Sequence, residues 1–169
     1  RAGIDALLVA AAVPSGFSGR MADLGAGAGT AAMAVLSRCR QARAVLVERE
    51  PVMCALARES LGLPGNEALA ERAGMLEADV ELRGLARRTA GLADASFDFA
   101  IMNPPFNAPA DRATPDALRQ SAHVMHDGLL EGWIRTASAI LKPKGGLAVI
   151  ARPQSLGALL AATTGRFGA

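Results

Sequence analysis

The chain has 169 residues, of which 51% are hydrophobic and 20% charged, which is enough apolar material for one domain with a full core. The net charge of +2 neither requires nor excludes a nucleic-acid partner. Cys39 and Cys54 have neither the spacing of metal ligands nor that of a disulfide framework, as is typical of reduced cysteines. The longest apolar run, 7–13, is too short to span a bilayer, and we expect no signal peptide. We therefore expect a cytoplasmic protein without a membrane or metal partner.

Predicted helices and strands alternate along the chain. Helical spacing of apolar residues predicts helices over 4–13, 30–40, 51–60, 66–73, 80–90, 127–141 and 155–162. Short apolar runs predict strands over 20–24, 44–48, 75–79, 97–102 and 147–151. Thr30 is a candidate N-cap for the second helix. This alternation favours an α/β, Rossmann-like, doubly wound and mostly parallel sheet with helices on both faces.

The domain organisation is simple. No internal repeat, low-complexity segment or second domain interrupts the pattern, so residues 1–169 are predicted to form a single domain. Because the chain begins at Arg1 without a methionine and ends without an obvious terminal element, we expect it to be a fragment.

A glycine-rich turn, 23–29, connects the first predicted strand to the next helix. Its glycines let the backbone turn sharply and approach a ligand, and the helix aims unpaired N–H groups at the same place. A dinucleotide fingerprint would need glycine where Thr30 stands. Asp23, two residues before the first glycine, would suit a positively charged ligand group such as an amino-acid ammonium better than a pyrophosphate. The alternative for Asp23 is a carboxylate satisfied by loop amides.

Two further acids end the next two predicted strands. Glu48 could accept hydrogen bonds from both hydroxyls of a ribose, or it could only pair with Arg49. Asp79 could accept a hydrogen bond from an adenine amino group. With Asp23, these acids follow three consecutive strands, so they are predicted to line one edge of the sheet.

The sequence Asn103-Pro104-Pro105-Phe106 follows the fourth predicted strand. The prolines have no N–H to continue a sheet ladder, and Pro104 restricts Asn103 to extended geometry. The strand end therefore displays a side-chain amide, a backbone carbonyl and an aromatic ring where open α/β sheets bind ligands. The alternatives are a rigid turn and, for Phe106, a buried core ring.

Other polar and aromatic residues are ambiguous or structural. Trp133 is predicted to be core, and His123 and His126 to have surface or packing roles. The arginines at 83, 87 and 88 either contact phosphates or form a solvated helix face.

These motifs resemble those of class I S-adenosylmethionine-dependent methyltransferases. Segment 23–29 resembles their glycine-rich motif, Glu48 their ribose-binding acid and Asp79 their adenine-contacting acid, and segment 103–106 resembles the motif of the branch that methylates amino nitrogens on planar groups. The Asp-Ala-Leu-Leu helix at 5–8, His126-Asp127 and the Leu-Lys-Pro-x-Gly-Gly turn at 141–146 are similar to bacterial tRNA(Val) adenine-N6 methyltransferases. This group would be expected to have His-Glu at 126–127, and its fold normally adds a C-terminal hairpin of two strands that this chain lacks.

The resemblance implies an S-adenosylmethionine-dependent N-methyltransferase that acts on an exocyclic amino group, adenine N6 of tRNA or another RNA, and releases S-adenosylhomocysteine. The residues implied for catalysis are Asn103, Pro104 and Phe106. Those implied for cofactor binding are Asp23, Gly25, Ala26, Gly27, Glu48, Arg49, Asp79, Val80 and Asn103.

Several other functions remain open from the sequence. A protein glutamine N5-methyltransferase would use the same Asn-Pro-Pro motif. A small-molecule O-methyltransferase would leave that motif without a role. A non-catalytic S-adenosylmethionine- or RNA-binding module would not need Asn103 and Phe106, and Thr30 and Asp23 disfavour a nicotinamide-binding domain.

Overall fold

The computed structural model describes residues 3–105 and 128–168. The helices are α1 (Ile4–Ala11), α2 (Thr30–Arg38), α3 (Pro51–Leu61), α4 (Glu67–Ala70), α5 (Gly84–Thr89), α7 (Leu129–Ile140), the 3-10 helix η1 (Pro153–Ser155) and α8 (Leu156–Thr163). The strands are β1 (Arg20–Leu24), β2 (Arg43–Glu48), β3 (Ala73–Glu77), β4 (Phe97–Met102) and β5 (Leu141–Val149).

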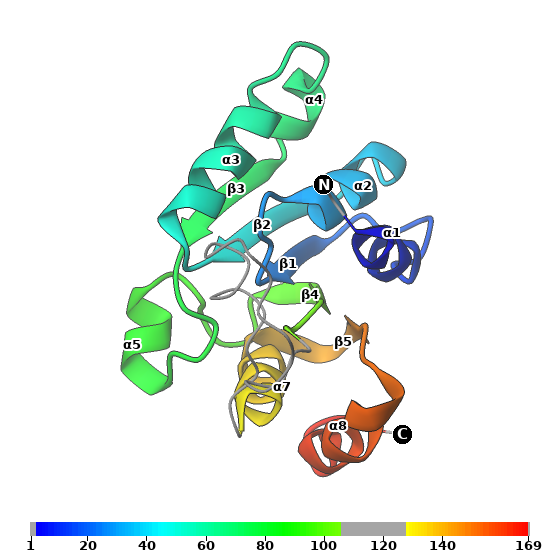
Figure 1. Ribbon diagram of the computed structural model, residues 1–169, viewed down its shortest axis with the longest axis vertical. Coiled ribbons are helices and arrows are strands. Elements are labelled where there is room, and N and C mark those ends of the chain that lie inside the picture. Colours follow the sequence, from blue (N-terminus) through cyan, green and yellow to red (C-terminus); the bar gives the residue numbers. More distant parts are fainter. Residues whose placement is uncertain (1–2, 106–127, 169) are drawn as a thin grey trace, which may run out of the picture.

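The strands form a single parallel sheet in the order β3-β2-β1-β4-β5 (Figure 1). From the central strand β1 the chain first builds outward through β2 and β3, and then returns to add β4 and β5 on the other side. The point of reversal, between β1 and β4, is where open α/β sheets bind ligands. The predicted α/β, doubly wound fold is confirmed.

Apolar side chains alternate between the two faces of the sheet, so each face has its own core. Met21 and Ile101 point into the core beneath α1, α2 and α3. Ala22 and Met102, their neighbours along the same strands, point into the core beneath α7 and α8. Figure 1 shows α1 and α2 on one side of the sheet and α7 and α8 on the other.

The region around the third strand differs from the prediction. The helix predicted over 66–73 is only the short α4, and β3 runs over 73–77 instead of 75–79. Arg72 is the physical reason, because its guanidinium donates hydrogen bonds to the carbonyls of Leu36, Cys39 and Ala42 at the end of α2 and the start of β2. These bonds hold the chain beside β2 from residue 73 onward. Asp79 therefore lies two residues beyond the strand that it was predicted to end.

Three other predicted boundaries also need correction. The helix predicted over 80–90 is the shorter α5, because Asp79 accepts the Glu81 N–H and forms a turn there. The N-cap of α2 is Gly29, not Thr30. The fifth strand was predicted to start at residue 147, but β5 already pairs at Leu141 and contains an irregularity before Gly146 pairs with Phe99.

Candidate active site

The glycine turn after β1 is built from left-handed residues and is attached to β2. Gly25, Gly27 and Gly29 have φ values of 71°, 53° and 84°, a region that favours glycine. The N–H groups of Gly25 and Ala26 both donate to the carbonyl of Val47 at 2.9 Å. A Cβ on Gly25 would lie 2.3 Å from the Trp133 ring, so no side chain fits between the turn and α7.

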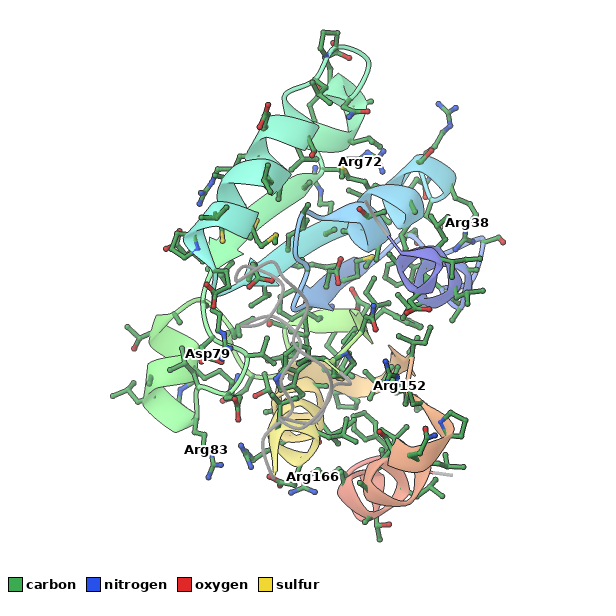
Figure 2. All side chains as sticks on the ribbon, in the orientation of Figure 1. Arg38, Arg72, Asp79, Arg83, Arg152 and Arg166 are labelled. Carbon is green, nitrogen blue, oxygen red and sulfur yellow. The ribbon has the colours of Figure 1, made fainter. Side chains whose placement is uncertain are left out.

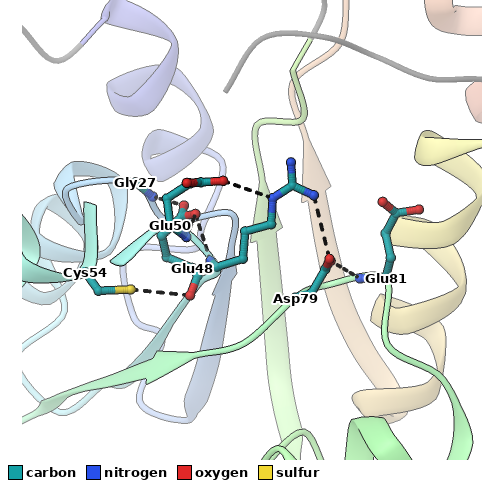
Figure 3. Close-up of polar contacts among 7 residues, drawn as sticks. Gly27, Glu48, Glu50, Cys54, Asp79 and Glu81 are labelled. Carbon is teal, nitrogen blue, oxygen red and sulfur yellow. Dashed lines mark hydrogen bonds and ion pairs between the residues drawn. The ribbon is translucent and has the colours of Figure 1, made fainter. Parts of the chain in front are cut away.

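Glu48, at the end of β2, is the main polar support of this turn. Its Oε2 accepts the Gly27 N–H at 2.9 Å, and its Oε1 accepts the N–H groups of Arg49 and Glu50 at 2.8 and 2.9 Å (Figure 3). Because each carboxylate oxygen has two lone pairs, Oε2 keeps one acceptor position for a ligand hydroxyl. The carboxylate is thus both a structural element of the turn and a candidate ribose acceptor.

One alternative from the sequence was that Glu48 only pairs with Arg49. The structure shows that the Arg49 guanidinium does not pair with Glu48. It lies 3.5 Å from a carboxylate oxygen of Glu50 and 3.6 Å from one of Asp79. Figure 3 shows that Asp79 also accepts the Glu81 N–H. Arg49 therefore connects the segments that follow β2 and β3.

Asp23 lies below the turn and is 3% exposed. Its Oδ2 accepts the Ala32 N–H at 3.0 Å. This carboxylate therefore accepts a hydrogen bond from an unpaired N–H in the first turn of α2, a role that the sequence had assigned to Thr30. Burial raises the pKa of Asp23 to about 7; the Ala32 hydrogen bond opposes this shift, and the nearby charge of Glu48 adds to it. The predicted contact of Asp23 with an ammonium group stays a prediction.

Asn103 follows β4, at the place where the sheet ladder stops. Ile150 donates the last ladder hydrogen bond to the Met102 carbonyl at 3.1 Å, and Pro104, which is buried, follows. The Oδ1 atom of Asn103 is buried and has no hydrogen-bond partner among the described residues. A buried acceptor without a partner costs free energy, and a ligand N–H would remove this cost. Phe106 lies outside the described residues, as do His123 and His126.

A cavity of about 400 Å³ joins these groups at the carboxyl edge of the sheet. Its lining contains these residues predicted for the site: Gly25, Glu48, Arg49, Asp79, Val80, Asn103 and Pro104. Asp23, Ala26 and Gly27 were predicted too, but they are not part of the lining.

Sequence reasoning missed Asp5, Glu50, Met53, Leu129, Trp133 and Arg152, which also line the cavity. Trp133 belongs to the core, as predicted, but its ring also forms a wall of the cavity beside Gly25. Helical periodicity identifies an inward face, and it cannot tell whether that face meets a core or a cavity.

These features fit a nucleoside ligand with an attached cationic group. The volume is within the usual range for small-molecule pockets. Glu48 and Asp79 offer acceptors for hydroxyl and amino groups, and the Gly25 backbone is exposed to the cavity without a Cβ. In the part of the chain that the structure describes, no cluster of His, Cys, Asp or Glu is placed to hold a metal ion, and no helix has the length and apolar character to cross a bilayer.

Comparisons with known proteins identify the class. The model of the methyltransferase small domain family matches residues 3–166, so the chain belongs to this family. A crystal structure of a predicted O-methyltransferase from Agrobacterium tumefaciens is 46% identical, with a TM-score of 0.80 over 97% of this chain and 69% of that chain. A search of curated proteins gives no significant match.

Two more distant crystal structures share the fold alone. Precorrin-6y C5,15-methyltransferase from Geobacter metallireducens is 16% identical, with a TM-score of 0.61 over 93% of this chain and 66% of that one. An S-adenosylmethionine-dependent O-methyltransferase from Thermotoga maritima is 17% identical, with a TM-score of 0.60 over 94% and 48%. The family match and the 46% identical Agrobacterium structure establish an S-adenosylmethionine-dependent methyltransferase.

Proposed function

We propose that the acceptor of this methyltransferase is an exocyclic amino group, specifically adenine N6 in tRNA or another RNA. The observation that carries the proposal is Asn103 Oδ1, which is buried at the cavity without a partner among the described residues. A hydrogen-bond acceptor in this position suits an acceptor group that brings N–H donors. An amino group attached to a planar ring has two such donors.

Asn103 and Pro104 have complementary roles in this chemistry. An exocyclic amine is a poor nucleophile because its lone pair is delocalised into the ring. Asn103 Oδ1 and the Pro104 carbonyl each accept one N–H, which holds the nitrogen and favours its pyramidal form. These bonds strengthen as the nitrogen becomes more positive, so they stabilise the transition state more than the ground state.

The remaining chemistry needs little from the protein. When bound, S-adenosylmethionine supplies an electrophilic methyl group, and Glu48, Asp79 and the Gly25 backbone would hold it at the β1–β3 side of the cavity. No strong general base is required, since the amine proton becomes acidic once the nitrogen is alkylated. Phe106 is predicted to stack on the target base, which must be unpaired or extruded to enter the cavity.

A second candidate is O-methylation of a small molecule, because the 46% identical Agrobacterium structure is described as a predicted O-methyltransferase. A hydroxyl acceptor has one donor hydrogen, so it would use Asn103 Oδ1 or the Pro104 carbonyl but not both. Protein glutamine, whose amide nitrogen also carries two N–H groups, remains a third acceptor with the geometry that Asn103 favours.

The test is transfer of labelled methyl groups by the full-length protein to unmodified RNA, to a protein extract and to a small-molecule extract, in separate reactions. Asn103→Ala is the test variant. Losing one hydrogen bond that is made to the reacting group is expected to lower kcat about 10²- to 10³-fold. Asn103→Asp keeps an acceptor and the side-chain shape, so it separates loss of the acceptor from loss of packing.

Label in RNA that depends on Asn103, with N6-methyladenine found after digestion to nucleosides, would support the proposal. Label only in protein would replace RNA with a glutamine acceptor. Label only in small molecules would favour O-methylation. Equal rates for wild type and Asn103→Ala on every acceptor would contradict the role given to Asn103.

A further inference from the structure

Thr136 on α7 holds the part of the cavity wall that follows β3. It is 2% exposed, and its Oγ1 donates to the Val80 carbonyl at 2.6 Å. A threonine inside a helix commonly donates to a carbonyl of the preceding turn, but this bond joins residues 56 positions apart in the sequence. Since a hydroxyl has one donor hydrogen, the donor capacity of Thr136 is used on the wall. Val80 itself is 4% exposed and lines the cavity.

Val80 and its neighbour Asp79 carry a donor and an acceptor for a ligand. The Val80 N–H, in contrast to the carbonyl, donates to no atom in the part of the chain that the structure describes. A buried N–H without a partner costs free energy that a ligand acceptor would remove. Asp79 Oδ1 accepts the Glu81 N–H at 2.8 Å and its Oδ2 lies 3.6 Å from Arg49, so each oxygen keeps a lone pair. Figure 2 shows Asp79 on this segment, beside α5.

The adenine of S-adenosylmethionine is complementary to this pair of groups. Its amino group donates and an adjacent ring nitrogen accepts, whereas Asp79 accepts and the Val80 N–H donates. Because the two protein groups belong to consecutive residues, a rotation of the backbone at Val80 changes the direction of both. Hydrogen bonds weaken steeply as their angles worsen, so the orientation of this backbone decides whether both contacts form.

The helix that follows this segment, α5, is fixed by a buried arginine. Arg87 is 4% exposed and donates to the Leu92 carbonyl and to Asp94. The sequence had assigned the arginine cluster at 83–88 to phosphate contact or to a solvated helix face, and the burial of Arg87 corrects both interpretations for this residue. The far end of the segment is thus held by α5, and the Thr136 bond holds its middle.

One face of α7 contributes to both sides of the cavity. Leu129, Trp133 and Thr136 are spaced four and three residues apart, so they share a helix face. Leu129 and Trp133 line the cavity, and the Trp133 ring lies against Gly25. Through Thr136, the same face holds Val80. The distance between the Trp133 wall and the segment after β3 is therefore set by one helix.

We propose that Thr136 is a positioning residue for the cofactor. By fixing the Val80 carbonyl from α7, its hydroxyl orients the Asp79 carboxylate and the Val80 N–H for the edge of the adenine ring. The bond forms before the ligand arrives, so the cofactor does not have to order this wall when it binds. The inference goes beyond the proposed function, since it concerns the cofactor and holds for any methyl acceptor.

The experiment measures two dissociation constants by calorimetric titration, one for S-adenosylhomocysteine and one for its analogue in which hydrogen replaces the adenine amino group. Thr136→Val keeps the shape of the side chain and removes the donor. It should weaken binding of S-adenosylhomocysteine about tenfold and of the analogue about threefold, so the preference for the amino group should shrink. Thr163→Val is the matched control, because the Thr163 hydroxyl donates to the Leu160 carbonyl at 2.9 Å on α8, outside this cavity. It should bind both ligands as wild type does.

Thr136→Ser and Thr136→Cys separate the donor from the packing of the side chain, and they replace Thr136→Val if that variant does not fold. Both lack the threonine methyl group and have nearly the same shape, but a thiol is a much weaker donor than a hydroxyl. Thr136→Ser should bind S-adenosylhomocysteine within about twofold of wild type, and Thr136→Cys about tenfold more weakly. Equal affinities of the two variants would show that the hydroxyl is not responsible.

Hydrogen exchange of the ligand-free protein gives a readout that does not depend on binding. In Thr136→Val, backbone N–H groups of residues 78–82 should exchange faster than in wild type, because the segment has lost its bond to α7. Thr163→Val should leave their exchange unchanged. Equal exchange in Thr136→Val and wild type would contradict the role of the bond in holding the wall.

A merely structural role of Thr136 would give a different set of results. Thr136→Val would then lower the free energy of unfolding and leave both dissociation constants unchanged, which would overturn the inference. Equal weakening of both ligands would also overturn it, because the bond would then not act through the adenine edge. None of these measurements needs a methyl acceptor, so a failure to methylate RNA would remove the proposed function without affecting this inference.

Discussion

The two halves of the cavity differ in how their polar groups are satisfied. At the β1–β2 half, Glu48 accepts three backbone N–H groups, and the buried Asp23 carboxylate beneath the lining accepts one. At the β4 end, Asn103 Oδ1 is buried without a partner in the described chain. The first half supports its own conformation, whereas the second half contains a hydrogen-bonding capacity that the described part of the fold does not use.

This difference separates stability from function. Residues of the β1–β2 half form hydrogen bonds within the protein. Substituting them should therefore lower the free energy of unfolding as well as the affinity for a ligand. The Asn103 side-chain oxygen makes no hydrogen bond within the described fold, so changing it should affect the reaction and spare stability. Substitutions in the two halves test this separation.

Gly25→Ala should give the largest effect. The new methyl group would lie 2.3 Å from the Trp133 ring, at a φ of 71°. Steric overlap and left-handed strain together should lower the free energy of unfolding by about 2–5 kcal/mol and abolish binding of S-adenosylhomocysteine. Urea denaturation followed by Trp133 fluorescence measures the first quantity, and calorimetric titration measures the second.

Gly27→Ala is the matched control for this prediction. Gly27 also has positive φ, at 53°, but a Cβ there would meet no atom within 4 Å. Only the backbone strain of about 1–2 kcal/mol remains. Equal destabilisation by the two substitutions would mean that close contact with Trp133 does not limit the turn.

Asp23 should make stability depend on pH. The native carboxyl has a pKa near 7, above its ordinary value near 4, so between these values the native state binds a proton that the unfolded state has released. Stability should therefore decrease by about 2–4 kcal/mol as pH rises from 4 to 7, and level off above that. Denaturant titrations across this range measure it.

Asp23→Asn tests the assignment, because its amide oxygen still accepts the Ala32 N–H but no longer titrates in this range. The slope between pH 4 and 7 should flatten in the variant. An identical slope in wild type and variant would show that another group is responsible.

Glu48→Ala and Asn103→Ala should differ in their effect on stability. Losing an acceptor shared by three N–H groups should cost about 1–3 kcal/mol. Removing a buried acceptor without a partner should leave stability unchanged or raise it by about 1 kcal/mol. Thermal unfolding of both variants measures the contrast, and a loss of similar size in Asn103→Ala would remove the basis for separating the two halves.

Local sequence signals predicted most of the fold. The strand over 97–102 and the glycine turn were placed correctly, because a double proline and clustered glycines leave the backbone few choices. The prediction was least accurate around β3, an edge strand whose start depends on Arg72 reaching carbonyls more than thirty residues away in the sequence. No local pattern contains that information.

The residues of the candidate site also divide into those that were predicted from the sequence and those that only the structure revealed. Residues adjacent to a strand end, such as Glu48 and Asn103, were found from the sequence, because the carboxyl ends of parallel strands share one edge. Trp133 and Asp5 reach the cavity from α7 and α1, whose positions are set by packing against the sheet. Sequence alone determined which chemical groups stand at the strand ends, since that depends on neighbouring residues. Tertiary structure decided that Asp23 is buried and that Asn103 Oδ1 has no partner in the described chain, because burial and hydrogen bonding depend on atoms that come together only when distant elements pack.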